Sequence, residues 1–397
     1  MKFTPAIFTR SKTLLIAGLV LFTVALLAPI LAGNRPLVLN LNGALHYPAI
    51  KGDADYSMRM TTLAQNEDVR WMVKPPIPFS PHDMDLHRVA VPPFSKAGIP
   101  GLENTRHWLG TDELGRDVLA QVIHGSRTSL VIALIAVALA VVIGILLGAV
   151  GGYWHNRTLR IHFLTLFIWL MIAIVLVHSA WVSWTIENLA AVLVFIPMLT
   201  LTYLLPRVNQ RLLKTPIKNW CVLLNPDTLV LWVIHLVTAL PAYFILIALI
   251  AVWRNVSVVG LSVILGLLMW PEIARLMRAS VISVRNEAYV DAASALGVSP
   301  WKVVIRHIAP NAWRSALTTI GFAVGAAIVA ESFLSFIGIS SANTVSWGTL
   351  LASSRSNPEW WWLSVFPGLA LISAVLVFYR LSGLLISSPE KKHSSPQ

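Results

Sequence analysis

The sequence predicts an all-α integral membrane protein, a polytopic bundle of helices, from three observations. Of 397 residues, 56% are hydrophobic and only 12% are charged, an apolar excess well beyond that of a soluble domain. The apolar residues gather in runs of about 18 or more, which is long enough to cross a bilayer. Because backbone groups in lipid must find their hydrogen bonds within the segment, such runs have to be helices.

Eight runs of this kind follow one another along the chain. Their approximate bounds are 13–32, 128–153, 161–182, 188–206, 228–253, 256–276, 314–338 and 361–386. We expect the first to be an uncleaved anchor, although the basic residues before it and the small residues near its end leave a cleaved signal peptide open. The chain then divides into a cytoplasmic segment with the first span (1–32), an external loop (33–127), a transmembrane domain (128–386) and a cytoplasmic tail (387–397).

Basic residues in the connecting loops predict the orientation. Lysine and arginine favour the cytoplasmic side of a membrane, and here they follow the second, fourth, sixth and eighth runs, whereas the other short loops contain few. Both termini are therefore expected in the cytoplasm. The net charge of +12 is dispersed among these loops, which indicates topology and argues against nucleic-acid binding. The prolines of the external loop favour an irregular cap over a large independent domain.

No motif predicts catalysis, a metal site or a cofactor. The stretch from Gly110 to Asp117 has the glycine spacing of a phosphate loop but lacks its Lys-Ser/Thr pair. We expect its residues to shape the start of the second span: Gly110, Thr111, Asp112, Gly115, Arg116 and Asp117. The single cysteine, Cys221, excludes an internal disulfide framework. The eleven histidines show no metal-binding spacing.

Ionisable residues inside apolar runs are the next candidates, because a charge in lipid is costly. His162, His178 and Glu272 are interpreted as lying near span ends, where they reach interfacial water. For His235 and Glu331 a place on a transport pathway and a role in packing both stay open. Separately, three glycines at four-residue spacing, Gly144, Gly148 and Gly152, predict close contact between two helices.

One cytoplasmic segment has the pattern of a small folded knob. Within residues 278–313, the stretch from Asp291 to Leu296 favours a helix, Gly297 is a C-cap candidate, and Ser299-Pro300 opens a second short helix. Such a knob would suit a groove on a partner protein. From the residues alone, an ordinary solvated connector is as good an interpretation as a docking knob.

This segment resembles the cytoplasmic loop, with the motif Glu-Ala-Ala, of permease subunits of bacterial ATP-binding-cassette importers. The motif positions are matched by Asp291, Ala292, Ala293, Gly297 and Pro310, with Asp291 in place of Glu and Ala309 in place of Leu. Residues 107–130 are similar to the signature before the second span of the dipeptide, oligopeptide and nickel permeases. Residues 330–338 with 346–348, and then 366–370, resemble later motifs of that family in the same order.

The resemblance implies a type I permease subunit in the bacterial inner membrane that moves di- or oligopeptides and has no bond chemistry or cofactor of its own. The branch of microcin C and oligopeptide permeases is the most similar. Implied partners are a second permease in a heterodimer, cytoplasmic ATPases docked on the loop, an extracytoplasmic substrate-binding protein and membrane lipid. The family has six spans, so residues 157–224 are interpreted as an inserted hairpin of unknown role. A secondary transporter and a non-transporting membrane assembly protein are the alternatives.

Overall fold

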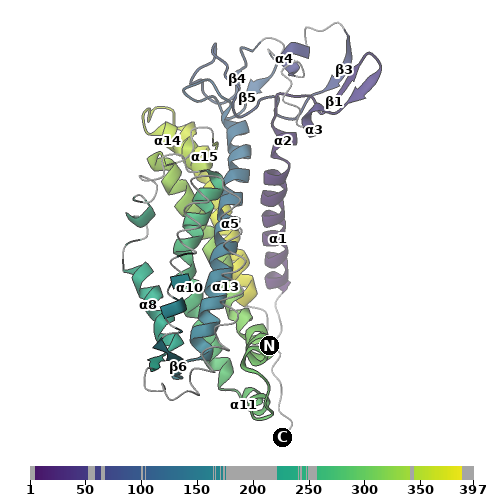
Figure 1. Cartoon of the computed structure of the whole chain (residues 1–397). Helices are drawn as coiled ribbons and strands as arrows, with labels where there is room; N and C mark the ends of the chain where they lie inside the picture. The colour runs from purple at the N-terminus through teal and green to yellow at the C-terminus, as the bar shows by residue number, and fades with distance from the viewer. Residues whose placement is uncertain are drawn as a thin grey trace.

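The molecule is a bundle of long helices that carries a small cap rich in β-strands at one end (Figure 1). The computed structural model describes residues 5–51, 59–63, 68–99, 102, 104–163, 165, 167–169, 171–172, 175, 221–239, 241, 244–246, 248, 257–339 and 344–386. Within these residues, four helices are long and apolar enough to cross a membrane, which confirms the predicted fold class. The expected span at 188–206 and most of 161–182 lie outside the described residues.

Two parallel helices form the centre of the bundle, α5 (Val118–Tyr153) and α10 (Val258–Arg285). The three spaced glycines lie along their contact. A Cβ on Gly144 would meet Ile273, one on Gly148 the carbonyl oxygen of Ala274 at 2.5 Å, and one on Gly152 Val281. The residue numbers of the contacts on α10 increase with those of the glycines on α5. The two helices therefore run in the same direction. The missing side chains let the two backbones approach closely.

The other helices pack around this pair. They are α1 (Pro5–Leu26), α2 (Ala28–Leu31), α8 (Pro226–Thr238), α13 (Ala309–Ile337), α14 (Trp347–Ser354) and α15 (Trp362–Ile386). Two expected spans differ from the observed helices. α5 begins at Val118, well before 128, and the predicted run 228–253 is interrupted after Thr238. Pro241 explains the interruption, because a proline disfavours helical backbone in the residue before it and offers no N–H.

The cap is built mainly from the loop between α2 and α5. Its larger sheet has the order β2-β1-β3, all antiparallel, from β1 (Val38–Leu41), β2 (Ala44–His46) and β3 (Val69–Val73). A second pair joins β4 (Ser95–Lys96) to β5 (Arg106–His107), and α3 (Pro48–Lys51) and α4 (Met60–Leu63) are single turns. The cap therefore contains more regular structure than expected, with its own small core around Ala32, Phe79 and Ala120.

At the opposite end of the bundle, two short strands flank the segment interpreted as an insertion. β6 (Leu159–His162) pairs antiparallel with β7 (Cys221–Leu224). The predicted knob follows α10 and contains α11 (Ala288–Ala295), α12 (Pro300–Val303) and a π-helical turn, η2 (Val304–Ile308). The predicted second short helix opens at Pro300 as α12, which then continues through η2 directly into α13. The Ala309 N–H bonds the Val304 carbonyl five residues back, a widened turn that accommodates Pro310, which has no N–H.

Candidate functional site

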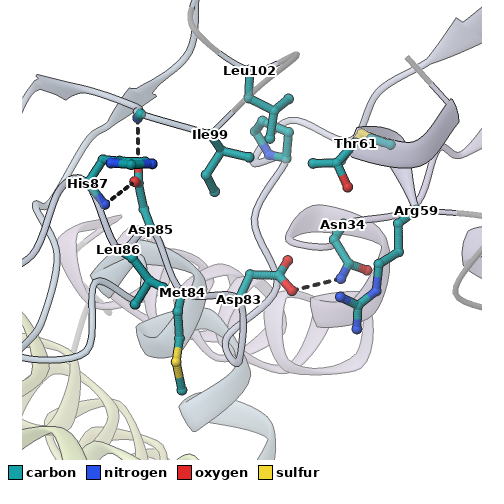
Figure 2. A pocket seen from close by; sticks show the side chains of 13 residues that line it. Asn34, Arg59, Thr61, Asp83, Met84, Asp85, Leu86, His87, Ile99 and Leu102 are labelled. Atoms are coloured by element: carbon teal, nitrogen blue, oxygen red, sulfur yellow. Dashed lines mark hydrogen bonds between the residues drawn. The ribbon is translucent and has the colours of Figure 1, made fainter. Parts of the chain in front are cut away.

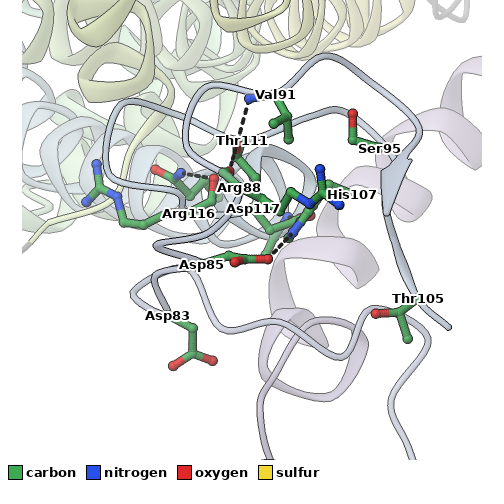
Figure 3. A network of polar contacts seen from close by, with 12 residues as sticks. Asp83, Asp85, Arg88, Val91, Ser95, Thr105, His107, Thr111, Arg116 and Asp117 are labelled. Carbon is green, nitrogen blue, oxygen red and sulfur yellow. Dashed lines mark hydrogen bonds and ion pairs between the residues drawn. The ribbon is translucent and has the colours of Figure 1, made fainter. Parts of the chain in front are cut away.

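Three clusters contain the residues singled out from the sequence: a turn under the cap, a buried carboxylate in the bundle and the cytoplasmic knob. In the first, Asp117 caps α5 by accepting a hydrogen bond from the Ala120 N–H at 2.8 Å. Its other oxygen lies 2.8 Å from Nδ1 of His107, whose Nε2 lies 3.4 Å from Asp85 (Figure 3). His107 and both carboxylates are only 1% exposed. These buried polar contacts therefore fix the start of α5 to the cap.

Asp112 organises the turn itself. Its carboxylate is fully buried and accepts hydrogen bonds from the backbone N–H groups of Leu114 and Arg116, from the Arg116 guanidinium at 2.7 Å and from the Gln121 amide at 2.9 Å. The donors of the turn are thus used within the chain, and a phosphate would have to displace a buried carboxylate. The arrangement favours a structural role for this motif.

The two glycines of the motif allow the turn to pack against the cap. Gly110 and Gly115 have φ values of +82° and +75°. A Cβ on Gly115 would lie 2.3 Å from the Asp85 carbonyl oxygen. Thr111 donates to the Arg88 carbonyl, and its own carbonyl accepts the Trp362 indole N–H at 3.0 Å. The turn therefore joins the cap, α5 and the start of α15.

A pocket of about 330 Å³ opens beside this turn (Figure 2). Asp83 accepts a hydrogen bond from the Asn34 amide at 2.9 Å, and Asp85 accepts the backbone N–H groups of His87 and Gly98. The pocket's carboxylates are therefore used to hold the loops of the cap. Across the part of the chain that the structure describes, no cluster of three metal-ligating side chains occurs.

The second cluster surrounds Glu331 in α13, which is fully buried. Ser129 of α5 donates to one carboxylate oxygen at 2.7 Å, and Ser335 donates to the other at 2.8 Å. A third hydroxyl, that of Ser332, lies 3.3 Å away. This carboxylate thus joins α13 to α5, and the described part of the chain places no cation against it. Of the packing and pathway roles left open, this geometry favours packing.

The other ionisable residues of the apolar runs are placed differently. His235 is exposed on α8 and does not reach the Glu331 cluster. The backbone of His162 pairs with Cys221, and His178 lies outside the described residues. Glu272 stands at the middle of the 28-residue helix α10, and its place near a span end stays a prediction.

The third cluster is the knob, whose base is packed into the bundle. Val290, Val304 and Ile308 are buried against Met277 and Val281 of α10. Gly297 has a φ of +78° and ends α11 as expected, with the Val298 N–H returning to the Ala293 carbonyl. A displacement of the knob must therefore move α10 as well.

The two alanines of the motif point in different directions. Ala293 is 9% exposed and faces this chain's own core, whereas Ala292 is exposed. ATPase docking through this motif stays a prediction, and of the two alanines Ala292 is the one open to a partner. Of the exposed apolar residues in the knob, Leu296 is the most exposed, at 84%, and sequence reasoning missed it.

An ion-pair cluster above the knob was also missed. Asp227, in the first turn of α8 just before the apolar run from 228, accepts two hydrogen bonds from Arg278 and lies 2.7 Å from Nδ1 of His155. The hydrogen bond from Arg278 is the main reason that the pKa of Asp227 lies below its ordinary value, and burial opposes this. Arg285 donates to the His155 carbonyl. The cluster holds the ends of α5 and α8 against α10.

Comparison with known proteins places this architecture in a class. Residues 225–389, somewhat less than half of the chain, match the family described as binding-protein-dependent transport system inner membrane component. They include α8, α10, the knob and α13 to α15. The resemblance read from the sequence is thereby confirmed: these residues form a permease domain of the ATP-binding-cassette importer type.

Individual relatives extend the similarity over most of the chain. The inner membrane ABC transporter permease protein YejE of Escherichia coli is 25% identical over 91% of this chain and 87% of its own length. The oligopeptide transport system permease protein OppC of Mycobacterium bovis is 25% identical over 79% of this chain and 81% of its own. The peptidoglycan transport system permease protein YejE of Agrobacterium fabrum is 24% identical over 91% and 84%.

Proposed function

We propose that this chain forms half of the pathway by which an ATP-driven importer moves peptides across the inner membrane. The observation that carries the proposal is the knob: Leu296 is 84% exposed at its outer end, while its base is buried against α10. An ATPase that holds Leu296 and Ala292 would therefore pull on a central helix of the bundle.

The mechanism follows from that linkage. ATP-driven closure of the ATPases would displace the knob as a rigid body, and the displacement would pass through the buried cluster to α10 and through the glycine contact to α5. Since packed helices shift between discrete arrangements, the bundle would alternate between outward-open and inward-open states. ATP hydrolysis itself belongs to the separate ATPase.

The partners follow from the ends of the bundle. The knob is the docking surface for the ATPase, and the cap at the opposite end is the surface offered to a substrate-binding protein. A second, related permease would complete the pathway as a heterodimer, with both termini of this chain in the cytoplasm and lipid around the bundle. Peptides are the proposed cargo because two relatives named above are permeases for oligopeptides or peptidoglycan.

Uptake measurements test the proposal. Cells that express the complete transporter should accumulate radiolabelled trialanine, and cells in which this chain is deleted should not. A peptidoglycan-derived peptide serves as the second cargo, given the name of the Agrobacterium relative. If the deletion left uptake of both compounds unchanged, the proposed function would be wrong.

A further inference from the structure

Glu272 and Arg275 form an exposed charged pair at the middle of α10, one of the four described helices that are long and apolar enough to cross a membrane. The Arg275 guanidinium donates to Oε1 of Glu272 at 3.2 Å and to the Thr238 hydroxyl of α8 at 3.0 Å. The side chain of Glu272 is 73% exposed and that of Arg275 is 41% exposed. About 20 Å of helix separates Glu272 from either end of α10.

Such a pair does not fit a lipid-facing position. A charged group in hydrocarbon costs several kcal/mol, and ionisable residues in spans therefore face water or protein. The structure shows a cavity at this place, of about 560 Å³, between α8, α10, α13 and α15. It opens where α8 ends, because the chain turns at Pro241 on the cavity wall.

The cavity combines one charged group with an aromatic wall. Glu272 lines it together with the hydroxyl-bearing residues Thr238 and Thr319. Phe322 and Tyr379 line it as well and contact each other edge to face, with ring centroids 5.3 Å apart. Among the described residues, Oε2 of Glu272 receives no hydrogen bond, since Arg275 uses Oε1. One carboxylate oxygen therefore remains for a ligand.

We propose that this cavity is a substrate-contact site of the translocation pathway and that Glu272 is a specificity-determining residue that binds an ammonium group of the passing peptide. A carboxylate forms short, charge-assisted hydrogen bonds to ammonium donors, and aromatic rings in the same cavity attract a cation through their faces. Arg275, held to one side by Thr238, keeps the carboxylate directed toward the cavity. The inference rests on the proposed function in peptide import.

The test compares charged and neutralised peptides in cells that express the complete transporter. Wild type should take up trialanine about tenfold faster than N-acetyl-trialanine, the ratio expected for one charge-assisted contact. Glu272→Gln should remove this preference, and Glu272→Asp should keep most of it. Glu359→Gln is the matched control, because Glu359 is an exposed carboxylate in the loop before α15. The binding protein is unchanged throughout, so a changed preference belongs to the permease.

The outcomes separate the inference from the function on which it rests. An N-acetylated peptide that contains lysine distinguishes the two sources of ammonium: recovered uptake assigns a side-chain ammonium, and continued slow uptake assigns the α-amino group. Three results would overturn the inference. They are a preference for trialanine that survives Glu272→Gln, equal uptake of trialanine and N-acetyl-trialanine by wild type, and an equal loss of uptake of both peptides in Glu272→Gln. Loss of co-purification of Glu272→Gln with the second permease would also overturn it, because the Glu272–Arg275 pair would then be a contact between subunits. If wild type took up neither peptide, the peptide function itself would fail.

Discussion

At the scale of single residues, the turn under the cap shows how a motif that looks like a phosphate loop serves as a joint. Its glycines are needed for two distinct reasons, a left-handed backbone and the absence of space for a side chain. Gly115 combines both, since its φ is +75° and a Cβ would lie 2.3 Å from the Asp85 carbonyl oxygen. Gly43 has a φ of +88° but nothing within 4 Å, which makes it a matched control.

We expect Gly115→Ala to lower the free energy of unfolding by about 1–3 kcal/mol more than Gly43→Ala does, because both alanines are strained but only the first overlaps backbone atoms. Thermal unfolding of the detergent-purified protein measures the difference. Equal losses for the two variants would show that Gly115 is needed only for its backbone conformation.

Sequence reasoning at this scale found residues whose partners are close in the chain. Asp117 and Arg116 were expected to shape the start of the second span, and their partners are local: Asp117 caps α5 and Arg116 pairs with Asp112. It missed the contacts of Asp227 with His155 and Arg278, and the hydroxyl group that Ser129 donates to Glu331, because these partners are far apart in the sequence. A buried carboxylate needs donors, but composition does not say which helix supplies them.

At the scale of helices, the knob depends on which side of α11 faces outward. Val290 is buried with residues of α10 and Ala293 is buried as well, whereas Leu296 is exposed. Helical periodicity alone could not decide this, since the alanine-rich stretch has no strongly apolar face and the position of α10 was needed. The family motif likewise names positions without separating residues that fold the knob from residues that contact a partner.

We expect Leu296→Asp to reduce co-purification with the ATPase by at least about tenfold, because an apolar anchor in an interface carries about 1.4 kcal/mol or more and a buried unpaired charge is unfavourable. Leu86→Asp is the control, at a leucine that is 75% exposed on the cap. Asp291→Glu should be nearly silent, since it keeps the charge.

Two further substitutions separate shape from contact in the knob. Ala293→Leu should disturb packing inside this chain, and Gly297→Val should strain a backbone with a φ of +78° and so redirect the start of α12. We expect both to leave the protein in the membrane and to reduce ATPase co-purification and peptide uptake. Wild-type retention of the ATPase in Leu296→Asp, Ala293→Leu and Gly297→Val would show that the segment is only a connector.

Replacing glycine by alanine should change the stability of the protein differently at the contact between α5 and α10 and at an open position. Gly148→Ala places a Cβ 2.5 Å from the Ala274 carbonyl oxygen and should destabilise the protein by about 1–3 kcal/mol. Gly383→Ala in α15 meets nothing within 4 Å and should be neutral or stabilising by up to about 1 kcal/mol. Thermal unfolding compares the two, and destabilisation of equal size would contradict the close-contact role of Gly148.

At the scale of the whole molecule, composition and run length were enough to predict a helical membrane bundle, because lipid leaves the backbone few alternatives. Helix ends were harder. α5 extends beyond its apolar run, and polar turns outside the membrane carry no hydropathy signal. The sheets of the cap were missed for a related reason: strands of two to five residues are too short for an alternating pattern to emerge.

The last prediction concerns the path of the chain between α5 and α10. These helices run parallel, so the chain must cross the membrane an odd number of times between them. We expect the apolar stretch that begins with α8 to supply one crossing, which leaves residues 157–224 to cross either twice or not at all. The basic loops on both sides of this segment favour two crossings, with Asn188 outside and Lys214 in the cytoplasm.

Alkaline phosphatase fused after Asn188 should therefore be active and fused after Lys214 inactive, and green fluorescent protein should give the reverse pattern. Fusions after Asn42 and Asn286 calibrate the two sides, because they lie in the cap and just after α10. If both test positions reported the cytoplasm, the inserted segment would lie on the inner membrane face beside the knob, and the bundle would have the six spans of its family.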